Sequence, residues 1–403
     1  MHVGIVFTID GYERCHLNSC PHDCPIPGAR GLQVPEGTGA LRVLILGEAC
    51  GDAEAWDGLP FRPHGAAGSL LERAITRSGF ARDQFVLHNV VPTQPPHNYL
   101  EGASYEAAAV EWGRPMLEKV IRDYNVGAIL ALGGVALRAT TGMCGDYRSI
   151  TRLQNWVLPS RWPGVAVVPA LHPAFIRRGA LPLFSVLMHA LKLSVSVANT
   201  GLGERTRFFS PVLWRDFEWL GQPVPSLDAP QVPAGYVCYP NESAAFGFLH
   251  EVEQHPTQLL AYDIETPRSA TVTENDSDEL EDQDILSVQF SLGRGTGIFL
   301  PFHGAYAEAA RAILALPNPK AGANTWRFDN PRLRARQCTI NGLNHDIRWM
   351  FHHLQPDLKG SLQFIASFYC VGKPGWAPWK HQHGNFCEFY GIRDVDCIME
   401  ILT

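Results

Sequence analysis

The sequence has no uninterrupted run of about 18 apolar residues, so we expect no transmembrane helix and no membrane partner. The segment Met1 to Asp10 lacks a basic stretch followed by a long apolar one, so it does not predict a secretion signal. A basic excess is also lacking, because the formal net charge is -7 over 403 residues. This excludes a protein that coats nucleic acid through overall charge. These absences together favour a cytoplasmic protein.

Disulfides are not expected in that compartment, although the chain has 10 cysteines. We expect most of them to be small, buried, apolar side chains. Cys15, Cys20 and Cys24 differ because they lie close together, with His16 and His22 among them. Thiolate and imidazole are ligands of zinc, so this cluster is a candidate metal site.

The first part of the chain alternates short apolar runs with segments of helical periodicity. Strands are predicted at 42–46, 84–89, 127–132 and 164–169, and helices at 68–75, 105–123 and 181–197. This pattern predicts a doubly wound α/β domain with a mostly parallel sheet. In such sheets the loops that follow the strands hold the ligand.

A second alternating pattern follows the proline-rich segment 222–235, which we interpret as a linker. Strands are predicted at 259–264, 285–291 and 297–300, and a helix at 307–316. The sequence therefore predicts two α/β domains, at 1–221 and 236–403. A hydrophobic content of 46% is sufficient for two cores.

Four short motifs of the first domain fall on the loops after predicted strands. They are GEACGDAE at 47–54, GLPF at 58–61, NVV at 89–91 and HPAFIR at 172–177. Their order and spacing resemble the uracil-DNA glycosylase superfamily, most closely its family 4 type, over roughly residues 20–197. The resemblance implies DNA as the partner and excision of uracil as the activity.

A glycosylase turns its base out of the duplex into a pocket, which needs a stacking face, a polar reader and a donor for the leaving group. Phe61 can supply the stacking face. The amide of Asn89 can donate and accept at the base edge. His172 can hydrogen-bond the uracil oxygen as negative charge develops. The resemblance assigns exclusion of the thymine methyl group to Glu54 and the attacking water to Glu48.

Two features of this region bear on DNA contact and on activity. The resemblance places Arg177 or Arg178 on a phosphate. Cys50 replaces the proline of the family motif, and the stretch from Phe61 to Gly68 is about two residues longer than in the family. An alternative is therefore a domain that reads a base without removing it.

The cysteine cluster also has a counterpart in the resemblance, since family 4 enzymes hold a four-iron cluster with two early and two later cysteines. Cys20 and Cys24 resemble the first pair, with one residue too many between them. The later pair falls near Thr93 and Gly113, where no cysteine is present. Three interpretations stay open: zinc or an Fe–S cluster that uses Cys15, Cys20, Cys24 and a histidine or a distant cysteine, loss of the metal, or a disulfide.

The second domain carries three acidic motifs in order: DIE at 263–265, NTWRFD at 324–329 and YGIRD at 390–394. They resemble the DEDDy 3′→5′ exonuclease domains of family A DNA polymerases, especially those of phage type, over about 236–403. The resemblance implies a ribonuclease-H-like fold and proofreading chemistry.

Hydrolysis of a phosphodiester at a 3′ end can use two divalent cations about 3.5–4 Å apart. Asp263, Glu265, Asp329 and Asp394 offer carboxylates, which Mg²⁺ or Mn²⁺ prefers. Tyr390 can orient the attacking water.

In family A polymerases a polymerase domain follows this exonuclease, whereas here the chain stops nine residues after Asp394. We therefore expect a separate DNA polymerase subunit as a partner, in the cytoplasm of a bacterium or a phage-infected host. The expected function combines uracil excision with proofreading. One alternative is an exonuclease with a non-catalytic base-reading domain, and another is a replication module in which neither site acts.

Overall fold

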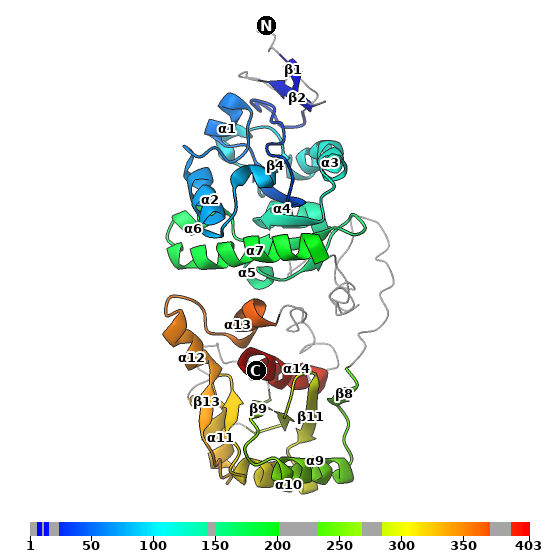
Figure 1. Ribbon diagram of the computed structural model, residues 1–403, viewed down its shortest axis with the longest axis vertical. Coiled ribbons are helices and arrows are strands. Elements are labelled where there is room, and N and C mark those ends of the chain that lie inside the picture. The colour runs from blue at the N-terminus through cyan, green and yellow to red at the C-terminus, as the bar shows by residue number, and fades with distance from the viewer. Residues whose placement is uncertain are drawn as a thin grey trace. The chain divides into compact units, whose positions relative to one another are not determined.

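A computed structural model of the chain describes residues 6–9, 12–15, 24–142, 150–200, 233–267, 284–370 and 388–403. It divides into two compact units, Met1–Leu227 and Asp228–Thr403, each with a sheet of its own (Figure 1). The predicted linker 222–235 lies almost entirely outside the described residues, which resume at 233. The fold is α/β in both units.

The first unit is built on a five-stranded sheet in the order β4-β3-β5-β7-β6. Its strands are β3 (Val43–Ala49), β4 (Val86–Val91), β5 (Ala128–Leu132), β6 (Leu158–Pro159) and β7 (Ala166–Ala170). All neighbours run parallel except β6, which is antiparallel to β7. The four predicted strands are confirmed, and their continuous apolar runs follow from burial of the sheet on both faces. A separate antiparallel pair is formed by β1 (Val6–Ile9) and β2 (Tyr12–Cys15).

Helices cover both faces of this sheet. They are α1 (Asp52–Asp57), α2 (Ala66–Arg77), α3 (Glu106–Asp123), α4 (Gly134–Thr141), α5 (Ile150–Leu153), α6 (Pro173–Arg177) and α7 (Phe184–Thr200), with short 3₁₀ turns at Arg82–Gln84, Pro96–Asn98 and Leu181–Leu183. By length and composition, the segment Leu181–Thr200 is apolar enough to cross a membrane, which the sequence had not led us to expect. Its buried side chains, among them Leu187 and Leu191, lie on the helix that packs against β5 and β7, so core packing accounts for its composition.

The second unit contains a six-stranded mixed sheet in the order β13-β12-β9-β10-β11-β8. Its strands are β8 (Gly235–Val237), β9 (Leu260–Glu265), β10 (Ser287–Ser291), β11 (Thr296–Pro301), β12 (Lys320–Gly322) and β13 (Asn344–Asp346). The strands β9, β10 and β11 form an antiparallel meander. On the other side of β9, β12 and then β13 add in parallel.

The two faces of this sheet are covered by different helices. The helices of the unit are α9 (Glu242–Gln254), α10 (Gly304–Ala315), α11 (Asp329–Ala335), α12 (Ile347–Leu354), α13 (Leu362–Tyr369) and α14 (Glu388–Leu402). Tyr262 and Ile264 join the core that contains α10, whereas Ala261 packs with Val395 and Ile398 of α14. Because side chains alternate along a strand, Asp263 and Glu265 lie on the α14 face.

Candidate active sites

The predicted residues of the first unit converge at the carboxyl ends of its parallel strands. Gly47 on β3 lies opposite Asn89 on β4. A Cβ added at Gly47 would lie 2.2 Å from Asn89 Oδ1 and 2.5 Å from Phe61 Cζ. A glycine is therefore required here, because any side chain would displace the amide or the ring.

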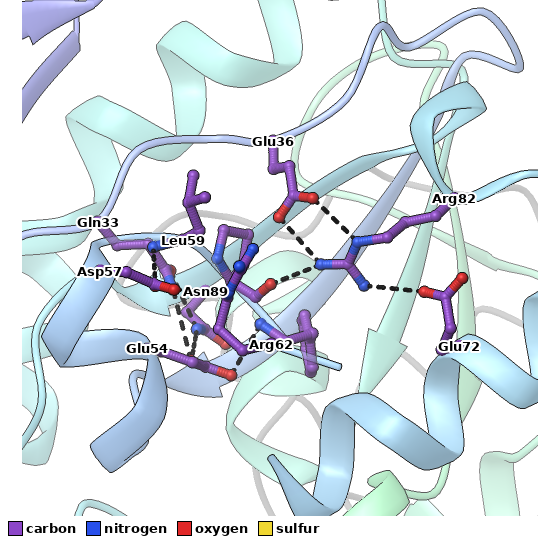
Figure 2. Close-up of polar contacts among 11 residues, drawn as sticks. Gln33, Glu36, Glu54, Asp57, Leu59, Arg62, Glu72, Arg82 and Asn89 are labelled. Atoms are coloured by element: carbon purple, nitrogen blue, oxygen red, sulfur yellow. Dashed lines mark hydrogen bonds and ion pairs between the residues drawn. The ribbon is translucent and has the colours of Figure 1, made fainter. Parts of the chain in front are cut away.

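Glu54 organises this site through four hydrogen bonds from four segments of the chain. Its Oε1 accepts from the backbone N–H of Phe61 at 2.8 Å. Its Oε2 accepts from Asn89 Nδ2 at 3.0 Å and from Gln33 Nε2 at 3.4 Å (Figure 2). The same oxygen accepts from the backbone N–H of Gly51 at 3.2 Å. Burial raises the pKa of Glu54, and these hydrogen bonds oppose that shift because they favour the carboxylate.

Gln33 completes the network, and no sequence motif had pointed to it. Its Oε1 accepts from Asn89 Nδ2 at 3.0 Å, so both N–H hydrogens of the Asn89 amide are directed to protein acceptors. Asn89 Oδ1 instead lies over Gly47. The sequence led us to expect that the Asn89 amide both donates to and accepts from a base. In the structure the Asn89 NH₂ group donates to Gln33 and Glu54, which leaves Oδ1 as the atom of the amide that faces the site.

The loop that carries Phe61 is held from several sides. Phe61 is buried and has a φ of 47°, a left-handed conformation that is rare for a residue with a side chain. Asp57 accepts from Leu59 N at 3.2 Å and pairs with Arg62 at 2.7 Å. Arg82 donates to the carbonyl of Pro60 at 2.7 Å (Figure 2). These contacts compensate for the backbone strain at Phe61.

Arg82 is in turn fixed by two carboxylates. Its Nε and Nη2 each lie 3.0 Å from an oxygen of Glu36, a bidentate pairing, and its Nη1 lies 3.5 Å from Glu72 (Figure 2). The guanidinium that supports the Phe61 loop is therefore itself oriented by Glu36.

His172 caps the N-terminus of α6, where Pro173 begins the helix. Its Nδ1 accepts from the backbone N–H of Ala174 at 3.2 Å, which assigns the proton of the neutral ring to Nε2. Burial, and secondarily the charge of Arg178, lowers the pKa of His172 to about 4. The Phe61 and His172 rings have centroids 6.2 Å apart. The ring is thus a neutral Nε2–H donor beside Phe61.

Glu48 is half-buried near the end of β3 in an acidic environment. Burial raises its pKa, and the nearby carboxylates of Glu101 and Glu106 raise it further. Arg138 opposes this effect and pairs with Glu101 at 3.0 Å and Glu106 at 2.7 Å. This environment makes Glu48 a better proton acceptor than an ordinary surface carboxylate.

Known proteins resemble this unit. The profile of the Uracil DNA glycosylase superfamily matches residues 34–191. The type-4 uracil-DNA glycosylase of Thermotoga maritima is 32% identical over 157 residues, which are 38% of this chain and 77% of that protein. That of Pyrobaculum aerophilum is 36% identical over 159 residues, 38% of this chain and 78% of that protein. The chain belongs to the uracil DNA glycosylase superfamily.

The resemblance predicted for the first unit is thereby confirmed at the level of the superfamily. The matched residues 34–191 contain Glu48, Glu54, Phe61, Asn89 and His172, and the second unit lies outside them. Arg177 and Arg178 also fall within the match, and both are exposed at the end of α6. Exposed arginines beside the site suit contact with phosphates.

The resemblance places metal-binding cysteines early in the first unit and near Thr93 and Gly113, and only the early positions carry a cysteine. Cys24 Sγ lies 3.8 Å from Thr93 Oγ1, so the expected early and later ligand positions are neighbours in space. At Gly113, an added Cβ would lie 2.1 Å from the carbonyl oxygen of Val90. A cluster with four cysteines in the family positions therefore does not fit these residues. Cys20 lies outside the described residues, as does the side chain of Cys15, so a site that uses them stays a prediction.

In the second unit, the structure brings together three of the predicted carboxylates. Candidate ligand oxygens of Asp263, Glu265 and Asp394 all lie within 4.8 Å of one another. Such a set of hard oxygen donors fits Mg²⁺ or Mn²⁺. Tyr390, one turn before Asp394 on α14, hydrogen-bonds that carboxylate, and burial, followed by the charge of Asp394, raises the pKa of the phenol. The tyrosine and the three carboxylates therefore form one site.

Asp329 lies beside this group rather than within it. Its Oδ1 accepts from the backbone N–H of Ile264 at 3.1 Å, between Asp263 and Glu265. Burial raises the pKa of Asp329 to about 7, with the nearby Asp346 charge adding to the effect. Its predicted role as a metal ligand stays a prediction.

Gln289 is a buried residue of this site that sequence reasoning missed. It lies directly opposite Asp263 on the neighbouring strand, and its Nε2 donates to Ser287 Oγ at 2.6 Å. A Cβ added at Gly391 would lie 2.7 Å from Gln289 Cδ. The glycine next to Tyr390 therefore allows α14 to approach the sheet closely.

Proposed function

We propose that the first unit excises uracil from DNA. The observation that carries this proposal is that Phe61 and Asn89 meet over Gly47, where no side chain fits between them, with the His172 ring 6.2 Å from that of Phe61. The similar proteins of Thermotoga maritima and Pyrobaculum aerophilum are type-4 uracil-DNA glycosylases, which supports the same reaction.

In the proposed reaction, Phe61 stacks on the extruded base and the oxygen of Asn89 accepts from the base N–H. The bond between C1′ and the base breaks, and its electron pair leaves with the base. His172 donates from Nε2 to the base carbonyl on which the charge accumulates, as a neutral ring because its pKa is about 4. Water adds to C1′, and Glu48 accepts its proton. Glu54 positions both Phe61 and Asn89.

We further propose that the second unit is a 3′→5′ exonuclease of ribonuclease-H-like fold. Asp263, Glu265 and Asp394 would hold a divalent cation, with Asp329 adjacent. When bound, Mg²⁺ or Mn²⁺ would stabilise charge on the phosphate and lower the pKa of water. Tyr390 would orient that water through its phenol. The mixed sheet, with the acidic residues on its strand β9 facing α14, supports this proposal.

A matched pair of DNA oligonucleotides, with and without one uracil, tests both activities. Alkali treatment after incubation in EDTA reveals abasic sites while a metal-dependent nuclease is silent. Cleavage only at uracil, lost in Asn89→Ala, supports the glycosylase. Shortening from the 3′ end on addition of Mg²⁺, lost in Asp263→Ala, supports the exonuclease. The glycosylase proposal fails if no abasic site forms, and the exonuclease proposal fails if the 3′ end stays intact.

A second candidate function for the first unit is recognition of a base in DNA without cleavage of the bond between the base and C1′. Two observations favour it: the amide hydrogens of Asn89 are directed to Gln33 and Glu54, and the buried Cys50 stands where the family motif has proline. Selective binding of uracil-containing DNA without abasic sites would distinguish this candidate.

DNA is the proposed substrate of both units, with Arg177 and Arg178 on phosphates. A separate DNA polymerase subunit is the proposed partner of the exonuclease, in the cytoplasm of a bacterium or a phage-infected host. Co-purification of the full chain with a polymerase from its source cells tests the partner, and recovery of the chain alone would oppose it.

A further inference from the structure

Two tryptophans of the second unit lie side by side and exposed. Trp326 is 55% exposed and Trp349 is 37% exposed. Their ring centroids are 6.5 Å apart and the ring planes differ by 31°. Two large aromatic side chains exposed next to each other form a contiguous apolar patch, and such a patch is a candidate contact surface for a ligand.

A buried carboxylate holds the two segments that carry the tryptophan pair. Asp346 is 2% exposed and accepts from the backbone N–H of Asn324 at 3.0 Å and of Trp326 at 3.3 Å. It also accepts from Arg348 N at 3.0 Å, as the cap of the helix that carries Trp349. The tryptophan pair is therefore arranged by the fold before any ligand arrives.

Positive charge accompanies the tryptophan pair. Arg327 follows Trp326 directly and Arg348 precedes Trp349, and both arginines are exposed. Arg348 Nη1 donates to Asn324 Oδ1 at 2.9 Å, which fixes the guanidinium beside the loop. Aromatic faces next to arginines match the bases and phosphates of a nucleic acid strand.

The tryptophan pair also lies near the acidic site. Trp326 is three residues before Asp329, so their Cα atoms are at most about 11 Å apart. Asp329 hydrogen-bonds the strand between Asp263 and Glu265. That separation corresponds to roughly three stacked bases at about 3.4 Å each.

We propose that Trp326 and Trp349 form a stacking platform for the bases of a single-stranded nucleic acid whose 3′ end reaches the acidic site. Duplex DNA has no free base face to offer, which makes an unpaired strand the fitting partner. The proposal rests on the proposed nuclease function only for the direction of the strand, because stacking itself requires no hydrolysis.

Photo-crosslinking of the full chain in EDTA tests the platform without relying on nuclease activity. A short single strand would carry 4-thiothymidine at the third and fourth positions from its 3′ end, where the separation from the acidic site places the stacked bases. We expect adducts on the tryptic peptides that end at Arg327 and Lys359, which contain the two tryptophans. These adducts should disappear in Trp326→Ala and persist in Trp326→Phe. Phe246→Ala, an exposed aromatic residue on α9, is the matched control and should leave them unchanged.

With Mg²⁺ present, Trp326→Ala should raise KM for a single-stranded 3′ end about 5- to 100-fold, the loss of one stacked base, with little change in kcat. Adducts confined to other peptides would overturn the proposal. The proposal would also be overturned if the protein sediments as a dimer, Trp349→Ala dissociates that dimer, and crosslinking is unaffected. The tryptophan pair would then bind a second copy of the chain. Adducts at Trp326 without hydrolysis would overturn only the nuclease proposal.

Discussion

Glu54 accepts a hydrogen bond from the backbone N–H of Phe61, and so holds an aromatic residue in the left-handed backbone region. The other oxygen of the same carboxylate binds Asn89. One buried side chain thus sets the positions of the proposed stacking face and the proposed base reader.

Replacing Glu54 by glutamine should separate these two roles. Its amide oxygen would turn to the three donors now on Oε2, which places the NH₂ group against the Phe61 N–H. We expect kcat/KM for uracil excision to fall about 10- to 100-fold, since losing a hydrogen bond to a charged group costs about 1.5–3 kcal/mol. Glu118→Gln, at an exposed carboxylate on α3, is the control and should behave as the parent. Parental activity in Glu54→Gln would show that Phe61 keeps its place without this bond.

Gly47 and Gly51 offer a matched pair of glycine substitutions. Gly47→Ala would place a methyl group 2.2 Å from Asn89 Oδ1, so we expect uracil excision to fall at least about 100-fold. Gly51→Ala meets no atom within 4 Å and should retain activity. Thermal unfolding of both variants checks that each is folded. Equal activity of the two would contradict the proposed position of the base over Gly47.

The acidic limb of the pH dependence of excision should report Glu48 rather than His172. His172 has a pKa of about 4 and stays neutral above that range, whereas the raised pKa of Glu48 means that its carboxylate is protonated first as pH falls. Activity should therefore decline on acidification before His172 is protonated. A pH profile of kcat/KM measures this, and in Glu48→Gln the acidic limb should move toward pH 4. If the acidic limb of the Glu48→Gln profile stays in place, a group other than Glu48 is responsible for it.

The lowered pKa of His172 also predicts how the stability of the fold depends on pH. Its folded pKa, about 4, lies below the unfolded value of about 6.5, so the unfolded chain takes up a proton first as pH falls. The contribution of neutral His172 is complete above about pH 6.5 and is lost progressively toward pH 4. Urea unfolding at a series of pH values should show a shallower acidic decline in His172→Gln. If stability declines with acidification as steeply in His172→Gln as in the parent, groups other than His172 cause the decline.

Tyr390→Phe should lower 3′→5′ hydrolysis about 10²- to 10⁴-fold, while leaving uracil excision unchanged. The phenol would no longer orient water, but the carboxylates of Asp263, Glu265 and Asp394 would still bind the cation. Titration with Mn²⁺ should therefore give the parental midpoint. Tyr239→Phe, at a tyrosine that is 82% exposed, is the control. Full activity of Tyr390→Phe would remove the tyrosine from the mechanism.

Much of the fold could be predicted from local pattern. The apolar runs that became β3, β4, β5 and β7 were recognisable because buried parallel strands need little but continuous hydrophobicity. The alternation around Asp263 and Glu265 likewise placed both carboxylates on one face of their strand.

The supporting residues could not be predicted, because their partners are distant in sequence. Gln33 binds Asn89 across 56 positions, and nothing in its local sequence signals the contact. Asp346 likewise accepts from the backbone N–H groups of Asn324 and Trp326, which lie 22 and 20 positions away in the sequence. Short strands such as β12 and β13 escaped recognition because three residues carry too little periodicity.

The close approach of Gly113 to the Val90 carbonyl limits how a metal-binding thiol could be introduced at that position. Thr93→Cys would place a thiol opposite Cys24 by a single substitution. At position 113 any side chain would first require α3 to lift away from β4. A cysteine at position 113 therefore demands a rearranged core as well as a new codon, whereas one at position 93 demands only the codon.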